Sequence, residues 1–410
     1  MADGGLTASP SSPRERGSTL RTRWARLPWW ARVLTIYAGA RAVTTAMILS
    51  FAARQQANPW TDAAPGYAEY ATIWDGNWYQ IVAVVGYPSE LPRTESGQVA
   101  ENAWAFMPVY PAVVRALMIV SGAGWDISAL MVSIACGVGA VLMFYRLMRL
   151  VLDESAATFA VLLFSVAPVS PLLQLSYAES MQALLLGVAL YLLLRRRYGW
   201  LLPVIAVMSL TRPTGLAFAL ALGIHVLVRF GARRRDPFPR REAVLATTAA
   251  GFSGVMGLSW PAIAWAVTGS PTAYTDTELA WRSAYIGYTE LIPFTPWFQG
   301  ATWWLGDPTG PIVVCLLVLA FAGVLFLPAV RRLGTDLRIW LAGYGLYLLA
   351  VFFPQSSTFR LLLPMFPLLG AVAQPRSWLY RTSVVALSLL GQWAWLWACW
   401  QVDGIDWTPP

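Results

Sequence analysis

The stretch ISALMVSIACGVGAVLMFYR, residues Ile127–Arg146, contains no charged side chain before Arg146. A bilayer core needs about 20 apolar residues in a helix, so this stretch predicts a membrane-spanning helix. The composition agrees, because 57% of the 410 residues are hydrophobic, only 12% are charged and 22 are Trp. A water-soluble globular protein is therefore excluded.

Similar apolar stretches recur along the chain. Together they predict an all-α polytopic membrane protein with about eleven transmembrane helices. The segment 199–230 supplies two of them and is interrupted at Thr211-Arg212-Pro213-Thr214-Gly215; its short first half is either re-entrant or displaced. The other predicted spans are 33–53, 127–146, 156–174, 178–194, 243–266, 311–330, 338–353, 361–374 and 380–400.

Arginine clusters predict the orientation of these spans. The clusters all fall on one side of the threading, which the positive-inside rule makes cytoplasmic. We therefore expect a disordered cytoplasmic tail at 1–32, one membrane domain at 33–402 and an extracytoplasmic tail at 403–410. Two long extracytoplasmic loops follow, at 54–126 and 267–310. The clusters are Arg14 to Arg32, Arg146 and Arg149, 195–197, 229–241, 331–338, and Arg376 with Arg381.

The first long loop is expected to carry two interfacial helices. Residues 105–122 are apolar enough to cross, but a crossing would move the next two arginine clusters outside. We therefore predict a helix on the outer membrane surface, with Pro108 and Pro111 near its start. Tyr70, Trp74, Trp78, Ile81 and Val85 recur at helical spacing and predict a second one.

Other classes of site find little support. The net charge of +8 comes from arginines grouped between apolar segments, which indicates membrane topology and no nucleic-acid partner. The three cysteines lie within apolar stretches without CxxC spacing, so neither a disulfide framework nor a zinc site is indicated. We predict no cofactor and no tightly bound metal. The single histidine, His225, is expected to be a packed core residue near the cytoplasmic end.

Five motifs occur in order between residues 70 and 375. The first runs from residue 74 to 81 and continues to Gly86-Tyr87, and the others are 106–111, 176–180, 211–215 and 359–364. In this order they resemble the PIG-V family, which comprises the second mannosyltransferase of GPI-anchor synthesis and its bacterial relatives. The resemblance implies a GT-C multispanning fold and a polyprenyl-phosphate sugar donor, for which polyprenyl-phosphate-mannose is the first candidate. Ile73 and Met107 depart from the family pattern and leave the donor and acceptor open.

Asp75 is the candidate catalytic residue. Sugar transfer from a lipid phosphate to a hydroxyl needs a base for the acceptor proton, and Asp75 is the acid most tightly enclosed by aromatics, in Trp74-Asp75-Gly76-Asn77-Trp78-Tyr79. Gly76 removes a side chain beside it, which we expect to admit the acceptor. The alternative is that Asp75 caps an interfacial helix.

Arginines are the candidate phosphate ligands, because they stay charged and bind phosphate bidentately. Arg212 and Arg360 both fall on the outer side at a helix break or end; pairing with Glu179 or snorkelling to the interface explains them equally well. Glu179 either binds an arginine, positions the acceptor or helps to hold a metal. The remaining substrate-binding candidates are Trp74, Asn77, Trp78, Tyr79 and Arg115, with Arg282 a further arginine to consider.

The prediction is thus an inverting glycosyltransferase of the cell membrane. It moves a sugar from a polyprenyl-phosphate donor to a lipid or envelope-glycan acceptor on the extracytoplasmic face. The main alternative is a lipid or lipid-linked-sugar transporter or flippase, which internal repeats and paired broken helices would favour. The aromatic residues of 267–310 fit either a lid over the substrate or an interfacial belt.

Overall fold

The computed structural model describes residues 24, 26–402 and 409. Its regular elements in these ranges are helices, and the β-structure among them is one isolated bridge between Arg93 and Val99. The all-helical prediction is confirmed. The predicted tails at 1–32 and 403–410 lie largely outside the described residues.

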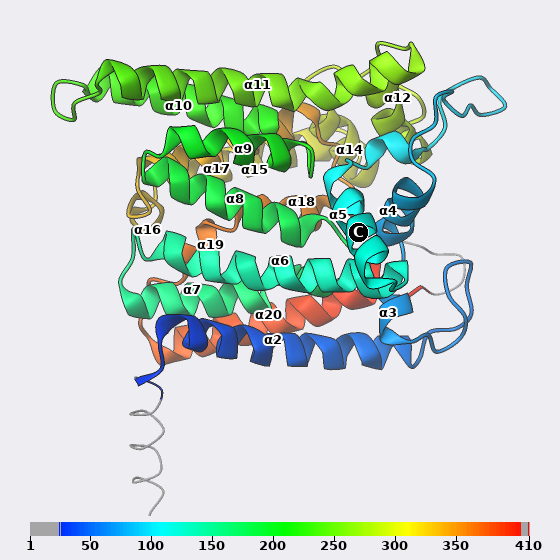
Figure 1. Ribbon diagram of the computed structural model, residues 1–410, viewed down its shortest axis with the longest axis horizontal. Coiled ribbons are helices and arrows are strands. Elements are labelled where there is room, and N and C mark those ends of the chain that lie inside the picture. The colour runs from blue at the N-terminus through cyan, green and yellow to red at the C-terminus, as the bar shows by residue number, and fades with distance from the viewer. Residues whose placement is uncertain (1–23, 25, 403–408, 410) are drawn as a thin grey trace, which may run out of the picture.

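Long helices lie side by side with roughly parallel axes (Figure 1). Five of them are long and apolar enough to cross a bilayer: α2 (Trp29–Ala52), α6 (Trp125–Met148), α10 (Gly215–Ala232), α11 (Arg240–Thr268) and α20 (Trp378–Cys399). Shorter helices complete the layers: α7 (Glu154–Val166), α8 (Glu179–Leu194), α9 (Tyr198–Ser209), α15 (Thr309–Val324) and α17 (Thr335–Val351). The helices follow the predicted apolar segments, and the shorter ones fall below the length assumed for each crossing.

Two predicted spans are interrupted by proline. Segment 156–174 is helical only to Val166, and after Pro168 it continues as the 3-10 turn η2 (Ser170–Gln174). The prediction of one helix at 361–374 is wrong. The chain there forms α18 (Thr358–Leu361), η3 (Leu363–Met365) and α19 (Leu368–Val372), because Pro364 and Pro367 lack the amide protons that a continuous helix needs.

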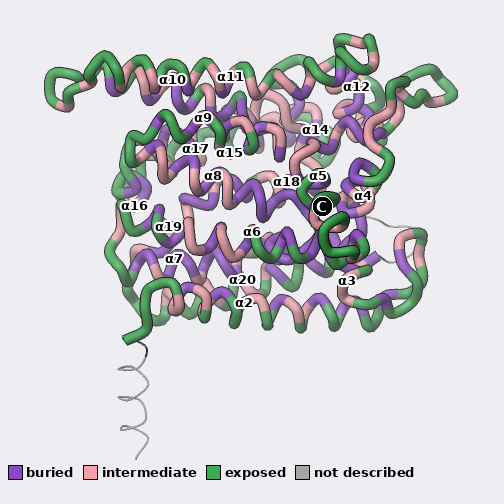
Figure 2. Tube along the Cα trace, in the orientation of Figure 1, coloured by how far each residue is buried: buried purple, intermediate pink, exposed green. Residues whose placement is uncertain are grey.

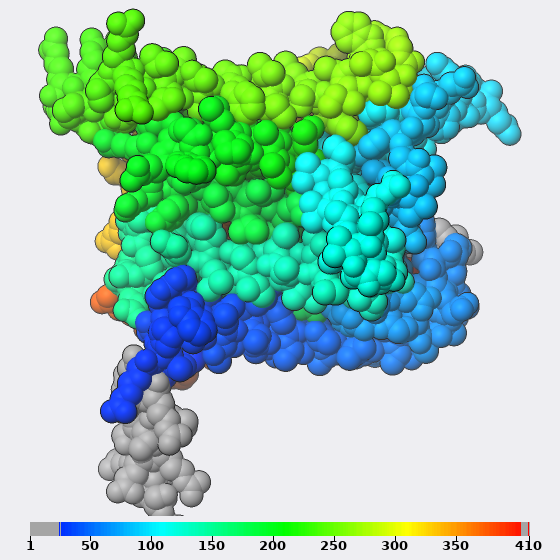
Figure 3. Space-filling model, in the orientation of Figure 1, coloured from blue at the N-terminus to red at the C-terminus, as the bar shows by residue number. Residues whose placement is uncertain are grey.

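Short helices gather at one end of the bundle, on the right in Figure 1. They come from both predicted long loops: α3 (Tyr67–Tyr70), α4 (Asp75–Val84) and α5 (Val109–Ser121) from the first, and α12 (Ala273–Ala280), α13 (Ser283–Ile286) and α14 (Pro296–Leu305) from the second. In the space-filling view residues of the first loop cover this end (Figure 3). Although far apart in the sequence, the two loops therefore meet at the same end.

The first loop corrects one prediction. Helix α5, with Pro108 at its N-cap, falls within the segment 105–122 that was predicted to be helical. The other predicted helix is two helices, because Trp74 adopts φ 62° and ends the helical path between α3 and α4. A positive φ is costly for a residue with a large side chain. The turn redirects the chain just before Asp75.

Burial decreases from the middle of the bundle outward. The central helices α6 and α8 are largely buried, whereas α2 and α11 expose long stripes (Figure 2). Leu316, Leu319, Leu387 and Leu390 are among the exposed large apolar side chains. Such a surface is stable against lipid and unfavourable in water. The apolar helices are those of a membrane protein.

Candidate active site

Four charged side chains meet at helix ends near the short helices. Asp75 is the first residue of α4 and Glu179 is the first residue of α8. Arg212 lies in the break between α9 and α10, and Arg360 lies in α18. A helix N-terminus stabilises a carboxylate, so both acids occupy favourable positions. We call these four residues the charge cluster.

The cluster is a closed set of ion pairs. Arg212 Nη2 lies 3.3 Å from Asp75 Oδ2 and also pairs with Glu179 Oε1. Arg360 Nη1 pairs with Asp75 Oδ2, and Arg360 Nε lies 3.6 Å from Glu179 Oε1. The exposed fractions of the four side chains are 13% for Asp75, 6% for Glu179, 14% for Arg212 and 11% for Arg360. Each arginine thus contacts both carboxylates, and the cluster as a whole is neutral.

Asp75 is held by contacts with distant parts of the chain. Its backbone N–H donates to the hydroxyl of Tyr177 at 3.3 Å, and the indole Nε1 of Trp74 donates to the carbonyl of Cys399 at 3.0 Å. The side chain of Asp75 accepts from the two arginines. The N-cap residue of α4 is Trp74, so Asp75 occupies the first helical position and not the cap itself.

The third sequence motif, at 176–180, packs against the residues that lead into the first one. The Ser176 N–H donates to the carbonyl of Ala71 at 3.0 Å, and the hydroxyls of Thr72 and Ser176 lie 3.0 Å apart. A Cβ on Gly76 would lie 3.3 Å from Thr72 Cγ2 and 3.4 Å from Ser176 Cβ. Gly76 therefore faces this packed contact, and the expectation that it leaves room for the acceptor is wrong.

Two tyrosine rings lie under the arginines. The guanidinium carbon of Arg212 is 5.9 Å from the ring centre of Tyr79, and that of Arg360 is 5.4 Å from the ring of Tyr177. Such contacts help to hold a cation in a weakly hydrated site. The Tyr79 hydroxyl, Glu179 Oε2 and Arg212 Nε are buried without a hydrogen-bond partner in the structure. A buried polar atom of this kind favours binding of a polar ligand.

An aromatic group lies next to the cluster and joins the two loops. Trp78 stacks on Phe106 with ring centres 5.5 Å apart, and Trp281 from the second loop contacts Trp78 edge-on, also at 5.5 Å. Tyr79 contacts Phe106 edge-on at 5.3 Å. Trp78, Phe106 and Trp281 form what we call the aromatic wall.

Two other candidate arginines donate to backbone carbonyls. Arg115 donates to the carbonyl of Ala83 at 2.8 Å, near the end of α4, and Arg282 donates to the carbonyl of Val351 at 2.5 Å. Asn77 is half-buried on α4. His225 is buried and bonds Tyr198 and Asp336, consistent with the predicted packed position.

Two residues near the charge cluster were not predicted as site residues from the sequence. Tyr177 belongs to a quoted motif, but its contacts with Asp75 and Arg360 depend on the fold. Glu278 on α12 had no distinctive signal. Burial raises the pKa of the Glu278 carboxyl, and Arg282, Arg212 and Arg360 act in the opposite direction. Glu278 on the second loop is thus influenced by both arginines of the charge cluster.

The side chains of the cluster set what it can do chemically. Among the described residues, no three His, Cys, Asp or Glu side chains form a group that could hold a metal ion. Two arginines can bind a phosphate, and a carboxylate between them can accept a proton.

Comparison with known protein families gives no match, and comparison with curated protein sequences gives none either. The PIG-V resemblance therefore rests on the sequence motifs. Solved structures similar to this chain include the Archaeoglobus fulgidus oligosaccharyltransferase tethered with an acceptor peptide, at 13% identity and a TM-score of 0.42, covering 91% of this chain and 56% of that chain. The apo form has 14% identity, a TM-score of 0.43 and the same coverage.

The same archaeal enzyme, AglB, in complex with an inhibitory peptide and a dolichol-phosphate, aligns at 14% identity with a TM-score of 0.42. That alignment covers 92% of this chain and 57% of the archaeal chain. This chain thus spans little more than half the length of the archaeal enzyme.

Proposed function

We propose that this protein is an integral-membrane glycosyltransferase of the GT-C type. It transfers a sugar, with mannose as the first candidate, from a polyprenyl phosphate to a hydroxyl of a lipid or envelope glycan. The reaction takes place at the end of the bundle where the two loops meet, which we assign to the extracytoplasmic face. The observation that carries this proposal is the charge cluster, in which two arginines with side chains only 14% and 11% exposed contact the same carboxylate.

Arg212 and Arg360 bind the donor phosphate. In a polyprenyl-phosphate-sugar the phosphate is a diester with one negative charge, and it leaves as a monoester that carries more. Two fixed guanidinium groups stabilise this developing charge more than they stabilise the bound donor, which is the requirement for catalysis. Their low exposure strengthens the interaction, because little water competes for it.

Asp75 accepts the proton of the acceptor hydroxyl. The acceptor oxygen forms a bond to the anomeric carbon, the bond from that carbon to the phosphate oxygen breaks, and its electron pair goes to the phosphate. Attack opposite the leaving group by one base-assisted nucleophile inverts the anomeric carbon. Since Asp75 Oδ2 pairs with both arginines, an incoming phosphate competes with it for them. Donor binding then leaves the carboxylate available to the acceptor.

The aromatic wall contributes a surface for the sugar. Trp78 and Trp281 are half-buried tryptophans in contact with each other, and the apolar face of a hexose packs well on such rings. Glu179 positions the two arginines through its contacts with both. Tyr79, with its buried hydroxyl free to bond, supplies a polar contact at the base of the site.

Purified protein in liposomes with membrane-lipid extract tests this proposal. We expect radiolabelled polyprenyl-phosphate-mannose to label a new lipid or glycan product, whereas labelled polyprenyl-phosphate-glucose and GDP-mannose do not. Arg212→Gln should abolish labelling. Arg93→Gln provides the matched control, because Arg93 is an exposed loop arginine bonded to the carbonyl of Gly97.

The outcomes separate the hypotheses. Transfer that survives Arg212→Gln would contradict the phosphate assignment. Transfer from another polyprenyl-linked sugar would replace mannose and leave the rest intact. Movement of unaltered labelled donor between the leaflets, without any transfer product, would overturn the enzyme and favour the transporter.

A further inference from the structure

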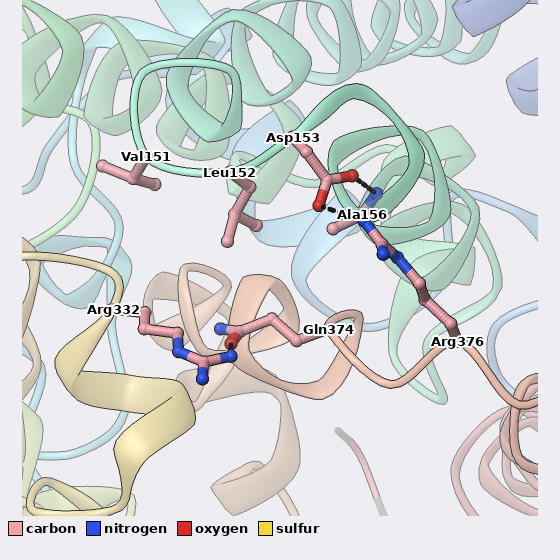
Figure 4. A pocket seen from close by; sticks show the side chains of 7 residues that line it. All are labelled: Val151, Leu152, Asp153, Ala156, Arg332, Gln374 and Arg376. Atoms are coloured by element: carbon pink, nitrogen blue, oxygen red, sulfur yellow. Dashed lines mark hydrogen bonds and ion pairs between the residues drawn. The ribbon is translucent and has the colours of Figure 1, made fainter.

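A second polar site lies at the opposite end of the bundle from the charge cluster, near α16 (Pro328–Arg331) and α19 (Figure 1). A cavity of about 600 Å³ opens there, between the turn joining α6 to α7 and the segment joining α19 to α20. Its polar lining consists of Asp153, Arg332, Gln374 and Arg376 (Figure 4). We call it the arginine pocket.

The positive charge of the pocket is only partly balanced. The carboxylate of Asp153 accepts the Ala156 N–H at 3.0 Å, which caps α7, and lies 3.2 Å from Arg376 Nη2. Arg332 donates to the neutral Gln374 Oε1 at 3.4 Å and forms no ion pair among the described residues. One acid thus faces two arginines, and that acid already has two partners.

Further arginines surround the pocket. Arg149 donates to the carbonyl of Leu152 at 2.7 Å, and Arg381 donates to the Ser155 hydroxyl at 3.2 Å. The nearby acid Glu154 is already paired with Arg32 at 2.6 Å. The excess positive charge therefore extends beyond the lining residues and favours an anion.

The pocket lies at the depth expected for lipid headgroups. Trp378, two residues after Arg376, is 77% exposed, and Trp30, at the start of α2, is 50% exposed. The pair between Arg32 and Glu154 joins the start of α2 to the start of α7, beside the pocket. Exposed tryptophans at helix ends mark a membrane interface. Val151 and Leu152 add an apolar wall to the same cavity.

We propose that the arginine pocket binds the phosphate of an anionic membrane lipid. Arg332 and Arg376 contact the phosphate oxygens, the Gln374 amide donates a hydrogen bond, and Leu152 packs against the glycerol and acyl chains. Basic pockets between helices are suited to such headgroups. A free phosphate would satisfy the arginines but not the apolar wall or the interfacial tryptophans. This proposal is independent of the sugar-transfer activity.

Lipid binding to purified protein in neutral detergent tests it. Native mass spectrometry measures Kd for short-chain phosphatidylglycerol, with phosphatidylcholine and inorganic phosphate as comparison probes. The test variant is Arg332→Gln/Arg376→Gln. Its control is Arg234→Gln/Arg235→Gln, which removes the same charge from two exposed arginines of the α10–α11 turn. Thermal unfolding without added lipid checks that each variant is folded.

We expect saturable binding of phosphatidylglycerol, weaker by about tenfold or more in the pocket variant and unchanged in the control. Equal weakening in both variants would overturn the proposal, because it would show general surface attraction. Equal affinity for phosphatidylcholine, or no saturable binding to wild type, would also overturn it. Displacement of the lipid by inorganic phosphate at equal concentration would identify a free-phosphate site instead.

Discussion

Glu179→Gln should destabilise the protein, although it changes one side chain by a single group. Glu179 is 6% exposed and contacts both arginines of the charge cluster. Wild type places two positive and two negative charges together, so the variant leaves a net charge of about +1 in a poorly hydrated site. Only Asp75 then remains to balance Arg212 and Arg360.

The magnitude follows from the geometry. Two unit charges at the 3.6 Å that separates Arg360 Nε from Glu179 Oε1 interact by about 5 kcal/mol at an effective dielectric constant of about 20. Removing one member of a buried ion pair typically costs about 3–5 kcal/mol. Because Asp75 still contacts both arginines, we expect the lower end, about 3 kcal/mol.

Reversible unfolding in mixed micelles measures the free-energy change. Glu154→Gln is the control, since Glu154 is 52% exposed in its pair with Arg32 and should contribute less than about 1 kcal/mol. The double variant Glu179→Gln/Arg212→Gln should lose less unfolding free energy than the two single variants lose together, by about 1–3 kcal/mol. A Glu179→Gln effect equal to the control, or additive single changes, would refute the buried-cluster reasoning.

Three further predictions address packing, capping and site assignment. Gly257→Ala should cost about 2 kcal/mol of unfolding free energy despite the better helix propensity of alanine, because its Cβ would lie 2.6 Å from the Leu216 backbone nitrogen. Gly251→Ala is the control: it lies on the same helix with no neighbouring atom within 4 Å of its Cβ, and its unfolding should show no loss of stability. The Ala156 N–H holds the pKa of Asp153 below its usual value. The stability contributed by this carboxylate is therefore present above the ordinary Asp pKa and is lost as pH falls through the lowered pKa of the folded state. Asp153→Ala should thus cost about 1 kcal/mol of unfolding free energy at neutral pH and less in acid. A difference between variant and wild type that does not change with pH would contradict this. Arg115→Gln should keep the sugar-transfer rate within about threefold of wild type, because Arg115 bonds the carbonyl of Ala83 on a helix. A large loss of rate would show that Arg115 acts in the site.

The helices were predictable wherever one apolar run makes one helix. Residues 127–146 predicted α6, observed at Trp125–Met148, because hydropathy and length suffice there. The run at 361–374 is equally apolar, yet Pro364 and Pro367 divide it. The helical spacing from Tyr70 to Val85 predicted one helix where the chain forms two. Nothing in that spacing shows that Trp74 takes a positive φ.

The candidate site was predictable as a set of residues but not as an arrangement. Asp75, Glu179, Arg212 and Arg360 each stood out as a charge beside an apolar segment. That all four meet depends on helix ends separated by up to 285 positions along the chain. Glu278 was missed because nothing in the sequence of the second loop shows that the fold brings its carboxyl under the influence of Arg212 and Arg360.

The most direct test of the proposed mechanism is the single-turnover rate of sugar transfer by Asp75→Asn at saturating donor. A general base contributes about 10²–10⁴-fold, so the rate should fall at least about a hundredfold. Donor binding, measured separately on the same preparation, should persist, because Arg212 and Arg360 remain. A rate within about threefold of wild type in a folded variant would contradict the assignment of Asp75 as the base.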